Sequence, residues 1–322
     1  MKGEIDLYCG IPFCVSRCAY CSFLSGVVGD GKTLAPYVNA LLEEIRSVTR
    51  LISERGLTVR AFYMGGGTPT SLASSMLDRV LDALAPLIGK AKEKTCEAGR
   101  PDTIDREKLR VLSAHGIGRI SVNPQTMHDE TLSLIGRRHT VADTLRAFAL
   151  AREERFRVIH MDLIAGLPGE NADMFAHSCE AIERLAPESL TVHTLAIKHA
   201  SLLHLWEAKL PDGDMAARMV RRGRETAAAM GMRPYYLYRQ KYMAGNLENT
   251  AYALPGCESL YNIGMMEETA DVIAVGAGAI SKRVNTKTGK ILRAPNVSDI
   301  AEYINRVPEM TARKAALLDA EI

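Results

Sequence analysis

The chain has 322 residues, of which 47% are hydrophobic and 24% are charged, and its formal net charge is only +2. This length allows a barrel-sized domain beside a smaller one, and the balanced charge argues against the basic surface of a nucleic-acid binder. No apolar run approaches the roughly 20 residues of a membrane-spanning helix, and the first residues lack the pattern of a secretory signal, so we expect neither.

Short apolar runs alternate with amphipathic stretches through the first two thirds of the chain. We expect strands at 7–11, 61–64, 95–97, 119–122, 158–164 and 190–195. We expect helices near 35–54, 73–88, 105–115, 141–155, 173–185 and 215–230. Six strand–helix units in a row predict an α/β fold with a parallel sheet and helices outside it. An open doubly wound sheet and a barrel-like (β/α)6 sheet both fit this period.

The alternation of strands and helices ends near residue 231. We place a boundary there between a domain at 1–231 and a smaller α+β region at 232–322. The runs RPYYLYRQKYM, GMMEETADVIAVGAGAIS and KILRAPNV predict strands, and a helix is expected near 298–306. The closing segment, PEMTARKAALLDAEI, is helical in pattern and stops without a cap, which suggests a shortened version of a longer chain.

Three cysteines follow the first expected strand within IPFCVSRCAYCSF, with the spacing C-x3-C-x2-C: Cys14, Cys18 and Cys21. A structural zinc site normally takes four ligands, and a redox pair needs only two cysteines. Cys9 could supply a fourth sulfur, but it lies inside the expected strand. Three thiolates suit an iron–sulfur cluster with one iron open to a small molecule, and zinc is the alternative. Seven cysteines in all, with three crowded together, favour a reducing cytoplasm over a disulfide framework.

Glycines and polar residues follow the other expected strands. The second strand runs into MGGGTPT, residues 64–70, whose glycines let the backbone approach a ligand but lack the lysine of a phosphate loop. Glu97 ends the third strand, Gln125 and Arg137 follow the fourth, and Asp162 interrupts the fifth. Because ligands bind at the carboxyl ends of parallel strands, we expect these groups to converge at one edge of the sheet.

Together these motifs resemble the radical S-adenosylmethionine (SAM) superfamily, and within it the oxygen-independent coproporphyrinogen III oxidases and their relatives. The matching runs are LYCGIPFCVSRCAYCSF, YMGGGTPT, EAGRP, PQTMHDETLSLIGRRHT, MDLIAGLPGE and AVGAGAIS, which span nearly the whole chain. The resemblance implies a partial (β/α)6 barrel whose mouth is covered by the C-terminal region.

The same resemblance implies two cofactors: a [4Fe–4S] cluster on Cys14, Cys18 and Cys21, and SAM bound to its open iron. An electron from the cluster splits SAM in this superfamily and gives a 5′-deoxyadenosyl radical. The positions that match SAM-contacting residues are Tyr8, Tyr20, Gly66, Gly67, Thr68, Glu97, Gln125, Arg137, Asp162, Ala196 and Ile280.

Several departures from the relatives narrow the branch. Oxidases that decarboxylate coproporphyrinogen carry a fourth cysteine where this chain has Phe23, a residue that the haem-chaperone branch also has. The chaperone motif HNxxYW is reduced here to Asn262, with Met265 and Met266 in place of Tyr and Trp. We expect the two methionines to lie in a strand and pack in the core. The run from 235 to 268 is most similar to HemZ-type coproporphyrinogen dehydrogenases.

The resemblance implies an oxidoreductase of porphyrin and haem biosynthesis that converts coproporphyrinogen III propionates to vinyl groups. The alternative is a haem-binding chaperone or carrier on the same scaffold. The partners implied are a tetrapyrrole or haem, and an electron donor such as flavodoxin or ferredoxin. A tetracarboxylate needs cations near the cluster; Arg239, Lys241, Lys282 and Arg283 are the candidates, unless they form a solvated basic edge.

Overall fold

The computed structural model describes residues 3–21, 26–29, 31–198, 201–206, 212–239, 241 and 243–321. The strands are β1 (Glu4–Ile11), β2 (Phe13–Cys14), β3 (Gly26–Val27), β4 (Thr58–Gly66), β5 (Glu93–Cys96), β6 (Arg119–Ser121), β7 (Val158–Ala165), β8 (Ser189–Thr194), β9 (Arg233–Tyr238), β10 (Asn249–Ala253), β11 (Val272–Val275), β12 (Ile280–Val284) and β13 (Ile291–Pro295). The helices are α1 (Leu34–Glu54), α2 (Ser74–Ile88), α3 (Arg106–Ala114), α4 (Asp129–Leu134), α5 (Val141–Glu153), α6 (Ala172–Leu185), α7 (Leu202–Leu205), α8 (Gly213–Ala229), α9 (Leu260–Met266), α10 (Ile300–Asn305) and α11 (Val307–Asp319).

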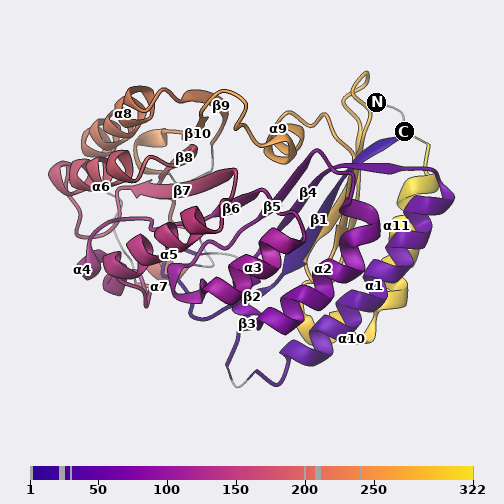
Figure 1. Cartoon of the computed structure of the whole chain (residues 1–322). Helices are drawn as coiled ribbons and strands as arrows, with labels where there is room; N and C mark the ends of the chain where they lie inside the picture. The colour runs from indigo at the N-terminus through magenta and orange to yellow at the C-terminus, as the bar shows by residue number, and fades with distance from the viewer. Residues whose placement is uncertain are drawn as a thin grey trace.

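A single large sheet organises the molecule. Within the described residues it has eleven strands in the order β13-β12-β11-β1-β4-β5-β6-β7-β8-β10-β9. The run from β1 to β8 through β4, β5, β6 and β7 is parallel throughout. Figure 1 shows the strands turning from steep at β1 to nearly level at β7, with helices in front of the sheet. The six expected strand–helix units are present, which confirms the α/β class.

Apolar side chains explain why this sheet is buried. Strands β1 and β4 carry Leu7, Ile11, Phe62 and Met64, and none of these side chains is exposed by more than a trace. Parallel strands covered on both faces need such near-continuous apolar runs. The long helix α1 presents one buried stripe to the sheet, which includes Leu41. Burial of these surfaces at about 25 cal/mol per Å² is the main force that holds the layers together.

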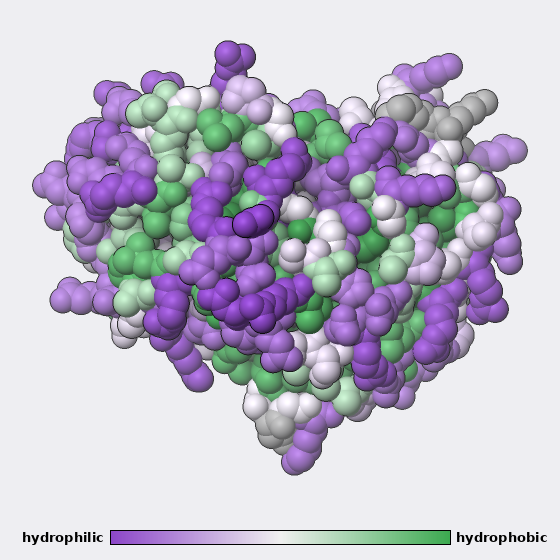
Figure 2. Space-filling view, viewed as in Figure 1, coloured by the Kyte–Doolittle hydropathy of each residue, from purple (hydrophilic) through white to green (hydrophobic). Residues whose placement is uncertain are grey.

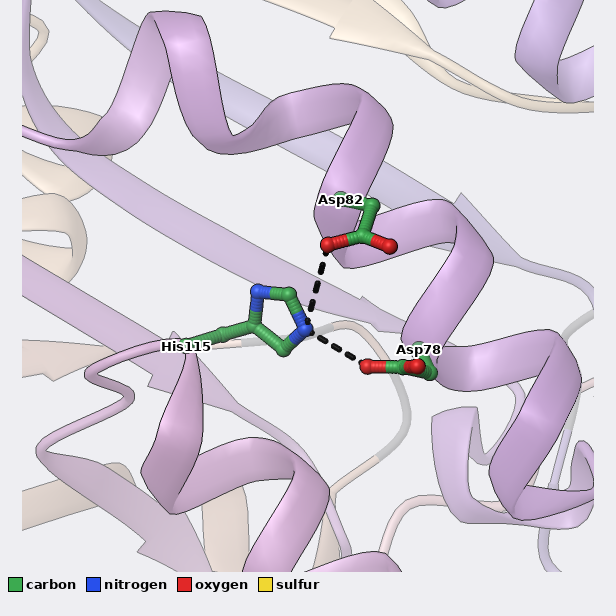
Figure 3. Close-up of side chains that lie close together, drawn as sticks. All are labelled: Asp78, Asp82 and His115. Atoms are coloured by element: carbon green, nitrogen blue, oxygen red, sulfur yellow. Dashed lines mark hydrogen bonds and ion pairs between the residues drawn. The ribbon is translucent and has the colours of Figure 1, made fainter.

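The outer helices pack against one another in chain order. One polar contact joins helix α2 to the end of helix α3. His115 follows α3, and its Nε2 lies 2.8 Å from the Asp78 carboxylate and 3.8 Å from that of Asp82, both on α2 (Figure 3). The two aspartates are exposed by 51% and 71%. Because the carboxylates face solvent, we assign this group to helix packing.

Residues after 232 extend the same sheet at both of its edges. Strands β10 and β9 add antiparallel beside β8, whereas β11 adds parallel to β1 and continues into antiparallel β12 and β13. The boundary at residue 231 therefore stays a prediction. The strand expected across residues 264–281 is wrong in its first part, because residues 260–266 form helix α9. Ser259 caps this helix by accepting from the Asn262 amide, which favours the helical start.

A buried polar network fastens the last helices to α1. Lys314 donates to Glu44 Oε1 and to Asn296 Oδ1, each at 2.6 Å, and none of the Lys314 or Glu44 surface is exposed. The second Glu44 oxygen accepts from the Tyr303 hydroxyl at 2.6 Å and from the Gly276 amide at 2.7 Å. Every carboxylate oxygen is therefore bonded, which a buried charge requires.

Figure 2 shows one face of the molecule, on which hydrophilic side chains surround small groups of hydrophobic ones. Isolated exposed apolar side chains of this kind are ordinary on a protein surface. In the described part of the chain, no helix is both long and apolar enough to cross a membrane.

We predict that Lys314→Met destabilises the protein, because it leaves the Glu44 carboxylate buried without its cation. The expected loss in the free energy of unfolding is about 3 kcal/mol in urea titrations followed by circular dichroism. The matched control is Lys92→Met, which removes an exposed ion pair to Glu4 and is expected to cost under about 1 kcal/mol. A loss for Lys314→Met no larger than that of the control would contradict this account of the network.

Candidate functional site

The three cysteines lie in a loop at the carboxyl ends of the parallel strands. Cys14 ends β2, which pairs in parallel with β3. The loop that carries the cysteines therefore lies between two short paired strands. The Cys21 amide donates to the Cys18 carbonyl at 3.1 Å and closes a turn between the second and third cysteines. None of the seven cysteines in the described chain forms a disulfide. Phe23, the position of the fourth cysteine in some relatives, lies outside the described residues.

The glycine run after β4 fits tightly around its neighbours. A Cβ on Gly67 would lie 2.4 Å from the Phe13 carbonyl oxygen, and one on Gly65 would lie 2.6 Å from Glu97 Oε2. Gly66 has a φ of 107°, which other residues rarely adopt. The amides of Gly67 and Thr68 donate to the carbonyls of Ile11 and Phe13 at 2.8 and 2.7 Å. The predicted close approach is therefore found, and its partners here are the chain's own backbone and a carboxylate.

Two further elements hold the cysteine loop from other sides. Arg100, at the end of the EAGRP run, donates to the Ser16 carbonyl at 3.1 Å and lies 3.5 Å from Cys18 Sγ. Its guanidinium is fixed by two bonds to Asp102 at 3.1 and 3.0 Å. On the other side, the Gly136 carbonyl accepts from the Ser16 hydroxyl at 2.9 Å. Sequence reasoning missed Arg100 as a site residue, although it lay inside a matched motif.

A cavity of about 190 Å³ lies directly against the loop. All three cysteines line it, and so do seven other predicted site residues: Tyr20, Gly66, Gly67, Thr68, Glu97, Gln125 and Arg137. The three sulfur atoms do not all lie within 4.8 Å of one another in the described chain.

Positive charge lies beside the thiols. Arg100 reaches Cys18, and the guanidinium of Arg137 lies close enough to Tyr20 and Cys18 for their interactions to raise its pKa, although burial opposes this. These two cations would offset the negative charge that three thiolates bring to a buried cluster. The donor set and its surroundings therefore suit an iron–sulfur cluster with three protein ligands.

A second cavity of about 400 Å³ adjoins the first along the inner face of the sheet. Tyr20, Cys21, Glu97, Asn123 and Gln125 line both, so the two spaces share a wall. The second cavity is also lined by the predicted residues Asp162 and Ala196.

Gln125, one of the shared lining residues, has a strained backbone. Its φ is 71°, which costs on the order of 1 kcal/mol or more in a residue other than glycine. Two backbone bonds hold the strain in place: the Gln125 amide donates to the Asp162 carbonyl at 3.0 Å, and the Gln125 carbonyl accepts from the Ile164 amide at 2.9 Å. A strained residue fixed in this way between two cavities is typical of a ligand site.

Two of the predicted SAM-contacting residues are not among the described residues that line either cavity. Tyr8 stacks instead on Tyr63 and Tyr261, with ring centroids 6.3 and 6.2 Å apart. Ile280 begins β12 and is 51% exposed. The structure therefore brings nine of the eleven predicted SAM positions, together with the three cysteines, around the two cavities.

Two carboxylates that line the larger cavity, Glu97 and Asp162, have different electrostatics. Burial raises the pKa of Glu97 to about 7, although the Tyr63 hydroxyl donates to it, and Asp162 raises it further. Burial also acts to raise the pKa of Asp162, but His160 and His193 outweigh it and hold that pKa well below its usual range. His160 Nε2 lies 2.8 Å from Asp162, while its Nδ1 lies 2.9 Å from the Ser189 hydroxyl, which donates to the Tyr252 carbonyl.

The four cations named from the sequence lie elsewhere. Arg239 pairs with Glu248 at 3.1 Å, Lys282 donates to the Met265 carbonyl, and Arg283 donates to carbonyls at the end of α11. In the described chain, neither these three nor Lys241 lines the two cavities. The expectation that these cations lie beside the cluster is therefore wrong, because Arg239, Lys282 and Arg283 are held by partners outside the two cavities. The basic residues that do line the larger cavity are Arg119, Lys198, His160 and His193.

The two methionines of the reduced chaperone motif behave differently from each other. Both belong to helix α9 and not to a strand, so the expected secondary structure is wrong. Met265 packs against the small cluster of Ala61, Tyr261 and Val272, as a core residue does. Met266 is 42% exposed and lines the larger cavity.

Comparison with known proteins agrees with this geometry. A family model described as the radical SAM superfamily matches residues 8–182. The chain is 41% identical to the oxygen-independent coproporphyrinogen-III oxidase-like protein HemZ of Bacillus subtilis, over 99% of this chain and 65% of that relative. It is 30% identical to the haem chaperone HemW of Escherichia coli, over 90% of this chain and 72% of the chaperone. It thus spans just under two thirds of the length of HemZ.

The solved structure of the coproporphyrinogen III oxidase HemN from Escherichia coli, described as a radical SAM enzyme, superposes with a TM-score of 0.75. The superposition covers 95% of this chain and 69% of HemN at 23% sequence identity. At this identity it shows that the two chains share a fold. The shared fold supports a partial barrel for this chain, and not an open doubly wound sheet.

The chain therefore belongs to the radical SAM superfamily. Its cofactors are accordingly a [4Fe–4S] cluster and SAM, as the cysteine motif predicts. The assignment of individual residues to these cofactors stays a proposal.

We predict that Gly67→Ala displaces the cysteine loop, because the new Cβ has no room beside the Phe13 backbone. The expected cost in stability is about 1–3 kcal/mol, with less iron bound per chain after anaerobic reconstitution. Gly118→Ala is the control, since a Cβ there meets nothing within 4 Å. Equal iron content in the two variants would contradict the role given to the glycine.

We also predict that SAM binding depends on the ionisation of Glu97. With a pKa of about 7, this carboxyl is mostly protonated in mild acid and becomes an anion able to bind an ammonium group as the pH rises. The affinity of the cluster-loaded protein for SAM should rise more than about tenfold between pH 5.5 and 7.5, below the pKa of an α-amino group. Anaerobic calorimetry measures this. Glu97→Gln should bind weakly with a flat profile, and a flat profile in the unmodified protein would argue against the assignment.

Proposed function

We propose that this chain catalyses the oxidative decarboxylation of coproporphyrinogen III propionates to vinyl groups, as a coproporphyrinogen dehydrogenase. The observation that carries the proposal is the adjoining pair of cavities, one lined by Cys14, Cys18 and Cys21 and the other by residues along the sheet. The similarity to HemZ across nearly the whole chain, and the fold shared with HemN, support the substrate class.

In this proposal Cys14, Cys18 and Cys21 hold the cluster, and the residues between the two cavities hold SAM. When bound, these cofactors supply one-electron cleavage of SAM to a carbon radical that abstracts hydrogen. Among the chain's own groups, the Glu97 and Asp162 carboxylates, which line the larger cavity, would accept hydrogen bonds from the ammonium and hydroxyl groups of SAM.

The remaining walls exclude water and orient the substrate. Tyr20 lines both cavities, and the rings of Tyr63, Tyr236 and Tyr238 line the larger one. Such rings provide apolar surface for a macrocycle and polar ends for orientation. Converting a propionate to a vinyl group removes one hydrogen atom, one further electron and carbon dioxide. The proposal therefore also requires an electron acceptor for this step, and an electron donor such as flavodoxin or ferredoxin for the cluster.

The second candidate function is haem binding and delivery on the same scaffold. Two observations favour it: the 30% identity to a haem chaperone, and the exposed thioether of Met266 in the larger cavity. Thioethers can ligate haem iron. Saturable haem binding that Met266→Ala abolishes and Met265→Ala preserves, with no turnover of porphyrinogen, would favour this function over the first.

The enzymatic proposal is tested by anaerobic turnover of the reconstituted protein with dithionite, SAM and coproporphyrinogen III. We expect 5′-deoxyadenosine together with tri- or divinyl product by liquid chromatography. Cys18→Ala should reduce both to background because one cluster ligand is lost, whereas Cys257→Ala, outside the cysteine loop, should retain them. Absence of deoxyadenosine in the unmodified protein with porphyrinogen present would refute catalysis.

A further inference from the structure

The end of the larger cavity farthest from the cysteines is lined by polar groups from four different elements. Arg119 begins β6, His160 lies on β7, Tyr235 on β9 and Asn262 on α9, and all four line the cavity. The cysteine loop lies at the opposite, carboxyl ends of the strands. From Arg119 to Asn123, which lines both cavities, four residues at about 3.3 Å each span roughly 13 Å. We call this group of four residues the cavity floor.

Arg119 is a buried cation whose guanidinium is incompletely bonded. Its side chain is only 4% exposed, and one terminal nitrogen donates to the Cys257 carbonyl. The buried Nε has no hydrogen-bond partner among the described residues. A buried charged group without its full set of partners costs free energy, unless a ligand supplies the missing acceptor.

The carboxylate nearest to Arg119 is already occupied by other donors. Glu93 Oε2 lies 3.9 Å from Arg119 Nε, beyond hydrogen-bond distance. The Glu93 carboxylate accepts instead from the Ser259 hydroxyl at 2.8 Å and from the Leu260 amide at 2.9 Å, at the start of α9. Glu93 therefore anchors this helix and leaves the Nε of Arg119 without an acceptor.

Tyr235 supplies a second unsatisfied donor at the same place. Its hydroxyl is buried and makes no hydrogen bond of good geometry in the described part of the chain, although Asn262 and Ser189 lie close enough to interact with it. Burial raises the pKa of Tyr235, while the nearby Arg119 guanidinium opposes this, so the two groups are close enough to interact. At neutral pH the phenol is thus a neutral donor beside a cation.

We propose that the cavity floor is a carboxylate-binding subsite, in which Arg119 and Tyr235 bind one carboxylate of the substrate. A guanidinium and a hydroxyl with free donors match the two oxygens of such a group. The inference rests on the proposed function, since there the carboxylate is a propionate of a tetrapyrrole. Holding one propionate at the floor leaves the rest of the macrocycle directed toward the cysteine end of the cavity.

The test is an anaerobic fluorescence titration of the cluster-loaded protein with coproporphyrin III, an air-stable tetracarboxylate of the same class. We expect Arg119→Gln to weaken binding about tenfold or more and Tyr235→Phe about fivefold, because each loses a hydrogen bond to a charged group. The matched control is Arg157→Gln: Arg157 donates to the adjacent Gly256 carbonyl at 3.2 Å but is exposed and outside the cavity lining. Its binding should stay within twofold of the unmodified protein, and iron content and SAM affinity should be unchanged in all three variants.

The outcomes separate this subsite from the proposed reaction. Tight binding that depends on Arg119 and Tyr235, without any turnover, refutes the reaction and leaves the subsite standing. Binding within twofold of the unmodified protein in both variants overturns the subsite, whether or not turnover occurs. So does the absence of saturable binding to the unmodified protein. Should Arg119→Gln fail to fold by circular dichroism, Tyr235→Phe decides the question, since it removes a single oxygen atom.

Discussion

The packing of Gly67 against the backbone of Phe13 is the contact on which the site depends. It joins two segments more than fifty residues apart and leaves no space for a side chain at position 67. The two amide bonds beside it place the start of the cysteine loop on the end of β4. Arg100 and the turn at Gly136 then fix the other sides of the loop. Since Cys14, Cys18 and Cys21 have no regular secondary structure beyond β2, their positions follow from these three supports.

Charge is ordered along the two cavities that this arrangement creates. Cations stand beside the thiols, carboxylates follow at Glu97 and Asp162, and Arg119 lies at the far end. The order suits an anionic cluster, then the ammonium and sulfonium of SAM, then an anionic substrate, each beside groups of opposite sign. Burial is the main cause of the raised pKa of Glu97, and the nearby Asp162 carboxylate adds to it. The same burial excludes water, which radical chemistry requires.

Much of this arrangement could be predicted from the sequence, and the failures have a common cause. Local signals sufficed for the strand–helix alternation and for the cysteine spacing, and the carboxyl ends of parallel strands must converge. Pairing between distant strands is not readable from local pattern, so the C-terminal strands were not expected at both edges of the sheet. For the same reason Arg239 and Lys282 were misplaced, and the cavity cation Arg119 was missed inside an apolar run. Met266 was assigned to a strand because a short apolar run does not separate strand from helix.

Electron paramagnetic resonance of the reduced protein, with and without SAM, combined with iron and sulfide analysis, tests the central claim most directly. The account predicts about four iron and four sulfide per chain. It also predicts a signal that changes when SAM is added, because three protein ligands leave one iron open to it. Zinc or no metal in oxygen-protected material, or a cluster signal that SAM leaves unchanged, would contradict it.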